Sequence, residues 1–120
     1  MDVVPKLIEP QFLVNWKTFN SKRKEKYPKY FTWLEQLIES ISKIKLNFVD
    51  STTKQNLFDL VDSYSNLDLK NISIDPHISE YVDEILEILK EERKRPKSSF
   101  RKGSRHGLLE IAGIMMTEVY

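Results

Sequence analysis

The sequence has no cysteine, three glycines and two histidines among its 120 residues. Without cysteine there is no disulfide, no thiolate metal ligand and no cysteine nucleophile. The shortage of glycine removes most of the residues that tight β-turns need, and so favours helices over hairpins. No apolar run approaches the roughly 20 residues of a membrane-spanning helix. Residues 1–5 lack the basic and apolar regions of a signal peptide, so we expect an intracellular protein.

Apolar residues at helical spacing predict about five helices. The clearest stripe alternates between spacings of four and three residues; it consists of Tyr30, Leu34, Leu37, Ile41 and Ile44. Pro10, Pro28 and Pro76 mark helix starts, because the first helical turn does not need the N–H that proline lacks. The predicted helices span about residues 10–25, 29–46, 52–65, 76–94 and 108–120, with residues 66–75 as a loop and 95–107 as a linker.

These segments predict an all-α fold, a compact bundle of about five helices with a basic loop before the last helix. The length suits a single helical domain over residues 1–120. Because the last apolar stripe reaches Tyr120 without a cap, the chain is also compatible with the N-terminal part of a longer protein. The predicted core consists of Trp33, Leu34, Leu37, Ile41, Leu60, Val61, Ile85 and Leu89.

The two signs of charge are separated along the chain, although the net charge is only +1. Residues 17–29 hold six bases and one acid, residues 30–92 hold 13 acids and five bases, and residues 93–105 hold seven bases and no acid. An approaching partner responds to such local fields rather than to the net charge. The charged stretches are therefore the first candidates for recognition.

The basic segment, residues 93–105, is the strongest candidate binding site. Its cations can neutralise phosphates, and Phe100 can stack on a base; the alternative is a solvated loop whose charge keeps it in water. Its start, residues 93–97, has the composition of a nuclear-localisation signal, so we expect a cytoplasmic or nuclear location. The candidate binding residues are Arg93, Lys94, Arg95, Lys97, Phe100, Arg101, Lys102 and Arg105.

Two serines of the basic segment are candidate phosphorylation sites. Ser98 and Ser104 each follow basic residues, as basophilic kinases prefer. A phosphate there would cancel about two charges and attract neighbouring arginines. The same pattern also arises by chance in any loop rich in serine and arginine.

The second basic cluster, residues 17–29, is interleaved with aromatic residues. Alternating bases and rings are typical of surfaces that bind single-stranded nucleic acid. The alternative is an ordinary amphipathic arrangement, with the rings in the core and the lysines on the solvated face. The aromatic residues are Trp16, Phe19, Tyr27, Tyr30, Phe31 and Trp33.

An acidic face is expected on the helix that contains residues 80–92. Its carboxylates are Glu80, Asp83, Glu84, Glu87 and Glu91. We interpret them as a solvated face, as the place where the basic segment folds back, or as a docking site for a basic partner. A metal site in a helical bundle would need Glu-x-x-His motifs on inward faces, and these are missing.

The sequence predicts a protein-interaction or regulatory module that uses the basic segment and the acidic face, with a partner protein that has an acidic surface. The alternative is a nucleic-acid-binding domain that contacts the phosphates of RNA or DNA through residues 17–29 and 93–105. An enzyme is least favoured, since His77 and His106 lie in no recognisable triad. No metal or other cofactor is predicted.

Overall fold

A computed structural model describes residues 10–45, 47–69, 75–95 and 100–117. The helices are α1 (Pro10–Phe19), α2 (Ser21–Lys26), α3 (Pro28–Ser42), α4 (Ser51–Tyr64), α5 (Pro76–Arg93) and α6 (Lys102–Thr117). The all-α prediction is confirmed, with six helices in these residues rather than about five. Within the same residues, no helix combines the length and the apolar character that crossing a membrane requires.

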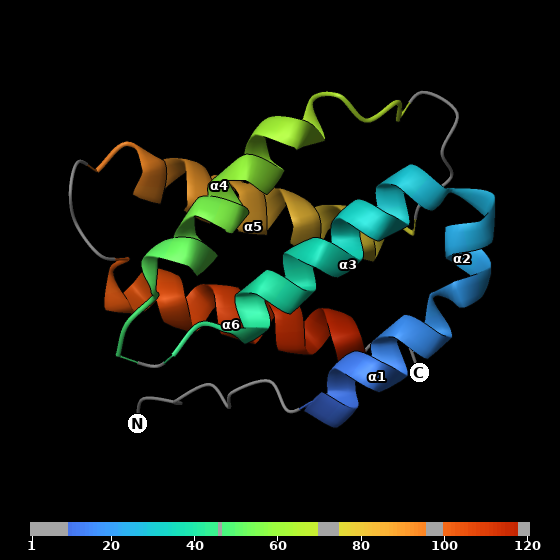
Figure 1. Ribbon diagram of the computed structural model, residues 1–120, viewed down its shortest axis with the longest axis horizontal. Coiled ribbons are helices and arrows are strands. Elements are labelled where there is room, and N and C mark those ends of the chain that lie inside the picture. Colours follow the sequence, from blue (N-terminus) through green and yellow to red (C-terminus); the bar gives the residue numbers. More distant parts are fainter. Residues whose placement is uncertain (1–9, 46, 70–74, 96–99, 118–120) are drawn as a thin grey trace.

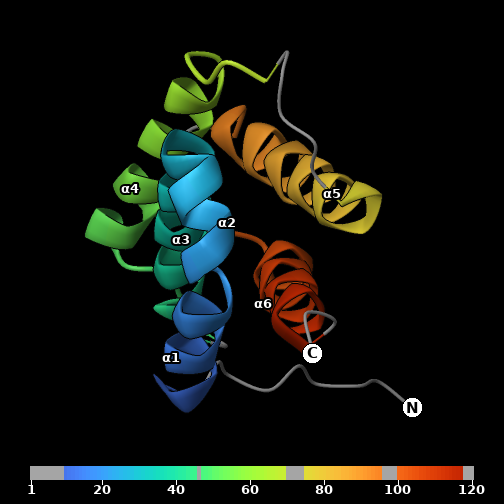
Figure 2. The same ribbon diagram turned by 90° about the vertical axis from the view of Figure 1, so that its right-hand side faces the viewer.

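The helices lie in two layers (Figures 1 and 2). Figure 2 shows α1, α2, α3 and α4 in one layer, and α5 with α6 in the other. The central helix α3 contacts α1, α2, α4 and α6, while α5 runs antiparallel to α6 and also contacts α4. The core therefore lies between α3 and the α5–α6 pair.

The helix starts follow local chemistry, as the sequence predicts. Pro28 occupies the first turn of α3, and Pro76 that of α5. Asp50 caps α4 by accepting a hydrogen bond from the Thr53 backbone N–H at 2.7 Å. Asp75 caps α5 by accepting one from the His77 backbone N–H at 2.9 Å. Each carboxylate satisfies an N–H that the helix itself leaves unpaired.

The prediction of a single helix over residues 10–25 is wrong. The helix is interrupted at Asn20, between the end of α1 and the start of α2. Asn20 is 0% exposed at this position, so its side chain points into the bundle. The break lets α1 pack on α3 and α6 while α2 packs on α3. The next helix also ends earlier than the predicted residue 46, because the Lys43 and Ile44 N–H groups close a tighter final turn after Ser42.

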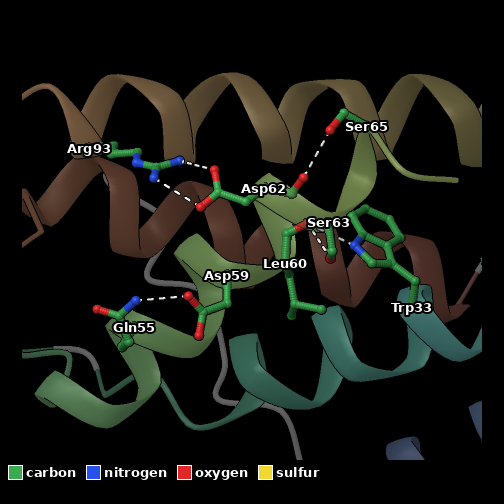
Figure 3. Close-up of polar contacts among 8 residues, drawn as sticks. All are labelled: Trp33, Gln55, Asp59, Leu60, Asp62, Ser63, Ser65 and Arg93. Carbon is green, nitrogen blue, oxygen red and sulfur yellow. Dashed lines mark hydrogen bonds and ion pairs between the residues drawn. The ribbon is translucent and has the colours of Figure 1, made fainter.

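The predicted core is buried except for one residue. Trp33, Leu34, Leu37, Ile41, Leu60, Ile85 and Leu89 are buried, and Val61 is half-buried. Trp33 Nε1 donates a hydrogen bond to the Leu60 carbonyl oxygen at 2.8 Å, which ties α3 to α4 (Figure 3). Val61 follows Leu60 and points about 100° away around the helix, so it cannot share that contact fully.

Glycine in the middle of α6 predicts a stabilising substitution. An added Cβ at Gly113 would meet no heavy atom within 4 Å other than those of its chain neighbours and its own helix backbone. Because glycine costs more backbone entropy than alanine in a helix, we expect Gly113→Ala to raise the free energy of unfolding by about 0.5–1 kcal/mol in urea denaturation. Gly107→Ala is the matched control, since its Cβ would lie 3.2 Å from Ile88 Cδ1. This variant should gain less stability than Gly113→Ala. A loss of stability in Gly113→Ala would contradict the packing described for α6.

Candidate functional site

A single buried carboxylate holds much of the basic segment against the bundle. Glu92 lies in the last turn of α5, and its side chain is 1% exposed. Arg95 Nη1 donates to Glu92 Oε2 at 2.9 Å, and Arg101 Nε donates to Oε1 at 2.8 Å. Ser104 Oγ donates to the same Oε1 at 2.6 Å. We call Glu92, Arg95, Arg101 and Ser104 the Glu92 cluster.

The hydrogen bonds keep Glu92 ionised despite its burial. Burial by itself raises the pKa of Glu92, because it removes water from the charged form. The hydrogen bonds from Ser104, Arg101 and Arg95 outweigh that effect and hold the pKa below its ordinary value. The cluster is therefore a buried anion surrounded by three donors.

The Glu92 cluster turns part of the predicted loop into ordered structure. The prediction of a linker over residues 95–107 is wrong for residues 102–107, which form the first turns of α6. The Arg105 backbone N–H donates to the Arg101 carbonyl at 3.0 Å, so the helical hydrogen bonding begins beside the cluster. Lys102 and Arg105 thus belong to a helix and not to a loop.

Phe100 is buried inside the bundle, 2% exposed. Its ring centroid lies 5.8 Å from that of Phe58 on α4. An Arg105 guanidinium nitrogen donates to the Phe100 carbonyl oxygen. The ring that the sequence offered for base stacking therefore packs in the core in this conformation.

Two other cations of the basic segment, Arg93 and Lys94, also pair with carboxylates. Arg93 pairs in bidentate fashion with Asp62 on α4, at 2.5 and 3.0 Å (Figure 3). Lys94 Nζ lies 3.3 Å from Glu91 Oε1. Lys102 is exposed, and Lys97 and Ser98 lie outside the described residues. The basic segment presents less free positive charge than its composition indicates.

The hydrogen bond with Arg93 lowers the pKa of Asp62, assisted by the guanidinium charge. Figure 3 shows Asp62 on the same helix as Gln55 and Asp59, with Arg93 reaching it from α5. Gln55 Nε2 donates to Asp59 Oδ1 at 2.8 Å, and the Ser63 and Ser65 hydroxyls donate to the Leu60 and Asp62 carbonyls. The polar side chains of α4 therefore mostly serve the helix and its contact with α5.

The acidic face on α5 is exposed, as the sequence predicts. Its members are Glu80, Asp83, Glu84, Glu87 and Glu91. Glu92 points the other way, into the bundle, and its role was missed. The signal was present, because Glu92 continues the alternating four- and three-residue spacing of the buried stripe on α5: Ile78, Val82, Ile85 and Leu89.

The second basic cluster splits into buried rings and a solvated face. Trp16, Tyr30, Phe31 and Trp33 are buried, which supports the amphipathic interpretation for these four. Phe19 remains 39% exposed, with the Arg23 guanidinium 5.0 Å above its ring. Phe12 and Val14 on α1 are also exposed, at 41% and 55%.

Two lysines of this cluster connect it to the central helix. Lys17 Nζ lies 3.3 Å from Glu39 Oε2, and Lys24 Nζ lies 2.9 Å from Oε2 of the buried Glu35. Lys22, Lys26 and Lys29 are exposed. The outer side of α1 and α2 therefore combines exposed apolar side chains with cations.

Buried polar atoms without a hydrogen-bond partner also occur at this end of the bundle. In the part of the chain that the structure describes, they are Trp16 Nε1, Asn20 Nδ2, Asn20 Oδ1 and Arg23 Nη1. The three residues follow helical spacings of four and three and belong to α1, α2 and the break between them. Each such group costs about 1–3 kcal/mol of lost solvation. The α1–α2 region is thus the least satisfied part of the described fold.

The described residues form a polar groove but no cluster of metal-binding type. No group of three or more His, Asp or Glu side chains among them is arranged to hold a metal ion. A polar groove between α3 and α4 includes Glu39, Lys43 and Asp59 in its lining. Glu39 pairs with Lys17, and Asp59 accepts from Gln55, so these carboxylates have structural partners.

No protein-family model matches this chain, and neither a curated protein nor a solved structure matches it. The surfaces of the bundle are therefore the basis for a functional proposal.

Proposed function

We propose that this protein is a helical protein-interaction module that docks a partner with an acidic surface on the outer side of α1 and α2. The observation that carries the proposal is a coincidence of two features in one short stretch. Phe12, Val14 and Phe19 are exposed on α1, and the buried polar atoms without a partner follow directly in the chain, at Asn20 in the break and Arg23 on α2. We call residues 12–26 the α1–α2 surface.

The apolar part of the α1–α2 surface supports binding to a protein. Three of the five large apolar side chains that are exposed in the described residues belong to α1, and Ile114 lies on α6, which contacts α1. Aromatic side chains are enriched in protein interfaces and often dominate their energetics. Phe12 and Phe19, two turns apart, are the expected anchors.

The charge of the α1–α2 surface indicates the chemistry of the partner. The helix α1 has no acidic residue, and α2 has one acid among four bases. Opposite charge on a partner would speed encounter and disfavour other partners. An acidic protein surface with apolar side chains at its centre matches this pattern.

The two surfaces predicted from sequence have different weights in this proposal. The basic segment contributes less, since Arg93, Lys94, Arg95 and Arg101 already pair with carboxylates of the same chain. The acidic face on α5 is exposed and suits a second, basic partner. Burial of Phe100 supports a protein partner over a nucleic acid.

Binding to defined probes tests the proposal. We expect an acidic amphipathic peptide to shift the backbone amide NMR signals of α1 and α2 at roughly 0.15 M salt, whereas its lysine-substituted counterpart should not. Replacing Phe12 and Phe19 together by alanine should lower the affinity for the acidic peptide at least about tenfold, because it removes both aromatic anchors.

The matched control is Phe48→Ala, since Phe48 is 48% exposed but lies outside the α1–α2 surface. It should leave peptide affinity unchanged. A single-stranded oligonucleotide is the competing probe. Micromolar binding of that oligonucleotide would favour the nucleic-acid alternative. A plot of the logarithm of its affinity against the logarithm of salt concentration should then have a slope of about −0.7 for each phosphate neutralised. Peptide-induced shifts confined to other helices would reject the α1–α2 surface.

A further inference from the structure

The Glu92 cluster contains a serine in the sequence context of a kinase substrate. Arg101 and Lys102 precede Ser104 by three and two residues. Ser98 and Ser104 are the two hydroxyl residues of the chain with an arginine three positions before them. Of the two, Ser104 lies in the described part, and its hydroxyl contacts a buried carboxylate at 2.6 Å.

We propose that Ser104 is a phosphorylation site for a basophilic protein kinase, and that its phosphate breaks the Glu92 cluster and releases Phe100 with the start of α6. The proposal does not depend on the α1–α2 surface. It adds a modification site whose effect follows from the contacts of one hydroxyl group.

The hydroxyl group is within reach of a kinase through local opening of the helix. Ser104 is half-buried, while Arg101, Lys102 and Gly103 before it are exposed. Ser104 lies in the first turn of α6, and helix ends open at low free-energy cost. Gly103 and Gly107 lower the helix propensity of the same stretch. Opening this turn presents the arginine, the lysine and the serine together.

The chemical step is an ordinary phosphoryl transfer from ATP. Ser104 Oγ forms a bond to the γ-phosphorus, and the bond between that phosphorus and the bridging oxygen of ADP breaks. The serine proton passes to the catalytic base of the kinase, and ADP leaves. The chain itself supplies only the acceptor and the basic recognition residues.

The product is incompatible with the geometry around Glu92. A phosphoserine has no hydroxyl proton to donate and carries about −1.5 to −2 charges at neutral pH. Its oxygens would lie next to the Glu92 carboxylate, and anions at that separation repel strongly in a buried site. Arg95 and Arg101 would pair with the phosphate, and Glu92 would lose the donors that keep it ionised.

Loss of the cluster spreads to Phe100 because the contacts share a short stretch of chain. Phe100 precedes Arg101, and an Arg105 guanidinium nitrogen donates to its carbonyl oxygen. When Arg101 leaves Glu92, the Phe100 ring can leave its contact with Phe58. We therefore expect exposure of an aromatic ring and of several cations at one end of α5 and α6.

Phosphorylation in solution tests the site directly. The probe is the catalytic subunit of cyclic-AMP-dependent protein kinase with magnesium ATP, acting on the full chain carrying Ser98→Ala. Mass spectrometry should place one phosphate on Ser104. Amide hydrogen exchange at residues 100–105 should then accelerate by at least about tenfold, and trypsin should cleave faster after Arg101. Treatment with a phosphatase should reverse both effects.

Variants separate the added charge from the lost hydrogen bond. Ser104→Glu should accelerate exchange at residues 100–105 more than Ser104→Ala does. Ser65→Glu is the matched control, because the Ser65 hydroxyl also donates a hydrogen bond, to the Asp62 carbonyl, yet does not belong to the Glu92 cluster. It should leave residues 100–105 protected. If Ser104→Glu fails to fold, the reversible enzymatic modification still decides the matter.

Two results would overturn the proposal. One is the absence of phosphate on Ser104 after prolonged incubation with an active kinase. The other is stoichiometric modification of Ser104 with unchanged exchange at residues 100–105.

Discussion

Glu92→Ala is expected to lower the free energy of unfolding by about 2–4 kcal/mol, since hydrogen bonds to charged groups contribute about 1.5–3 kcal/mol each and are not additive. The substitution removes the acceptor of Arg95, Arg101 and Ser104 at once. It also leaves a small cavity where the side chain was buried. Urea denaturation followed by circular dichroism measures the change.

The neighbouring residue provides the control. Glu91 is exposed and pairs with Lys94 on the surface, so Glu91→Ala should change the free energy of unfolding by less than about 0.5 kcal/mol. Equal effects at the two positions would show that Glu92 does not organise the basic segment.

The pH dependence of stability gives the same contact a second readout. Because the pKa of Glu92 is lowered in the folded protein, its ionised form is stabilised by folding. That contribution is complete above the ordinary carboxyl pKa of about 4.3, and it is lost as the pH falls through the lower folded value. The stability difference between the wild type and Glu92→Gln should therefore shrink as the pH falls below about 4. A difference that stays constant down to pH 2 would contradict the ionised cluster.

Leu37→Ala is expected to cost about 2–5 kcal/mol, the range for removing a large buried side chain. Leu37 is fully buried on α3, the helix that contacts both layers. Its loss removes apolar burial and leaves a cavity that the surrounding helices can fill only in part. Equilibrium unfolding in urea measures the change.

Val14→Ala is the control for Leu37→Ala, because Val14 is exposed on α1. It should cost less than about 0.5 kcal/mol. A cost below about 0.5 kcal/mol for Leu37→Ala as well would mean that α3 is not packed as described.

Local patterns in the sequence were sufficient for the helical class and for most of the core. The stripe on α3 predicted its buried side because an apolar face must be removed from water wherever the helix lies. Pro28 and Pro76 predicted helix starts because the first turn of a helix does not need the N–H that proline lacks. These features need no knowledge of the rest of the chain.

The Glu92 cluster could not be derived from local pattern alone. In the sequence, residues 93–105 show a run of cations with no acid, so they predict a solvated basic loop. In the folded chain, one carboxylate from the preceding helix is carried into the interior and attracts Arg95, Arg101 and Ser104. The spacing of Glu92 on the buried stripe hinted at its burial, but its partners depend on how α5 and α6 meet.

The sequence by itself determined the all-α class, the starts of α3, α4 and α5, and nearly all of the predicted core, because these depend on side-chain periodicity and on short-range hydrogen bonding. Only the tertiary structure decided the break at Asn20, the early start of α6 and the burial of Phe100. It also decided which cations of the basic segment pair with carboxylates. The physical reason is that burial and pairing are properties of surfaces brought together by packing, and the free energy of a charge depends on what lies within a few ångströms of it.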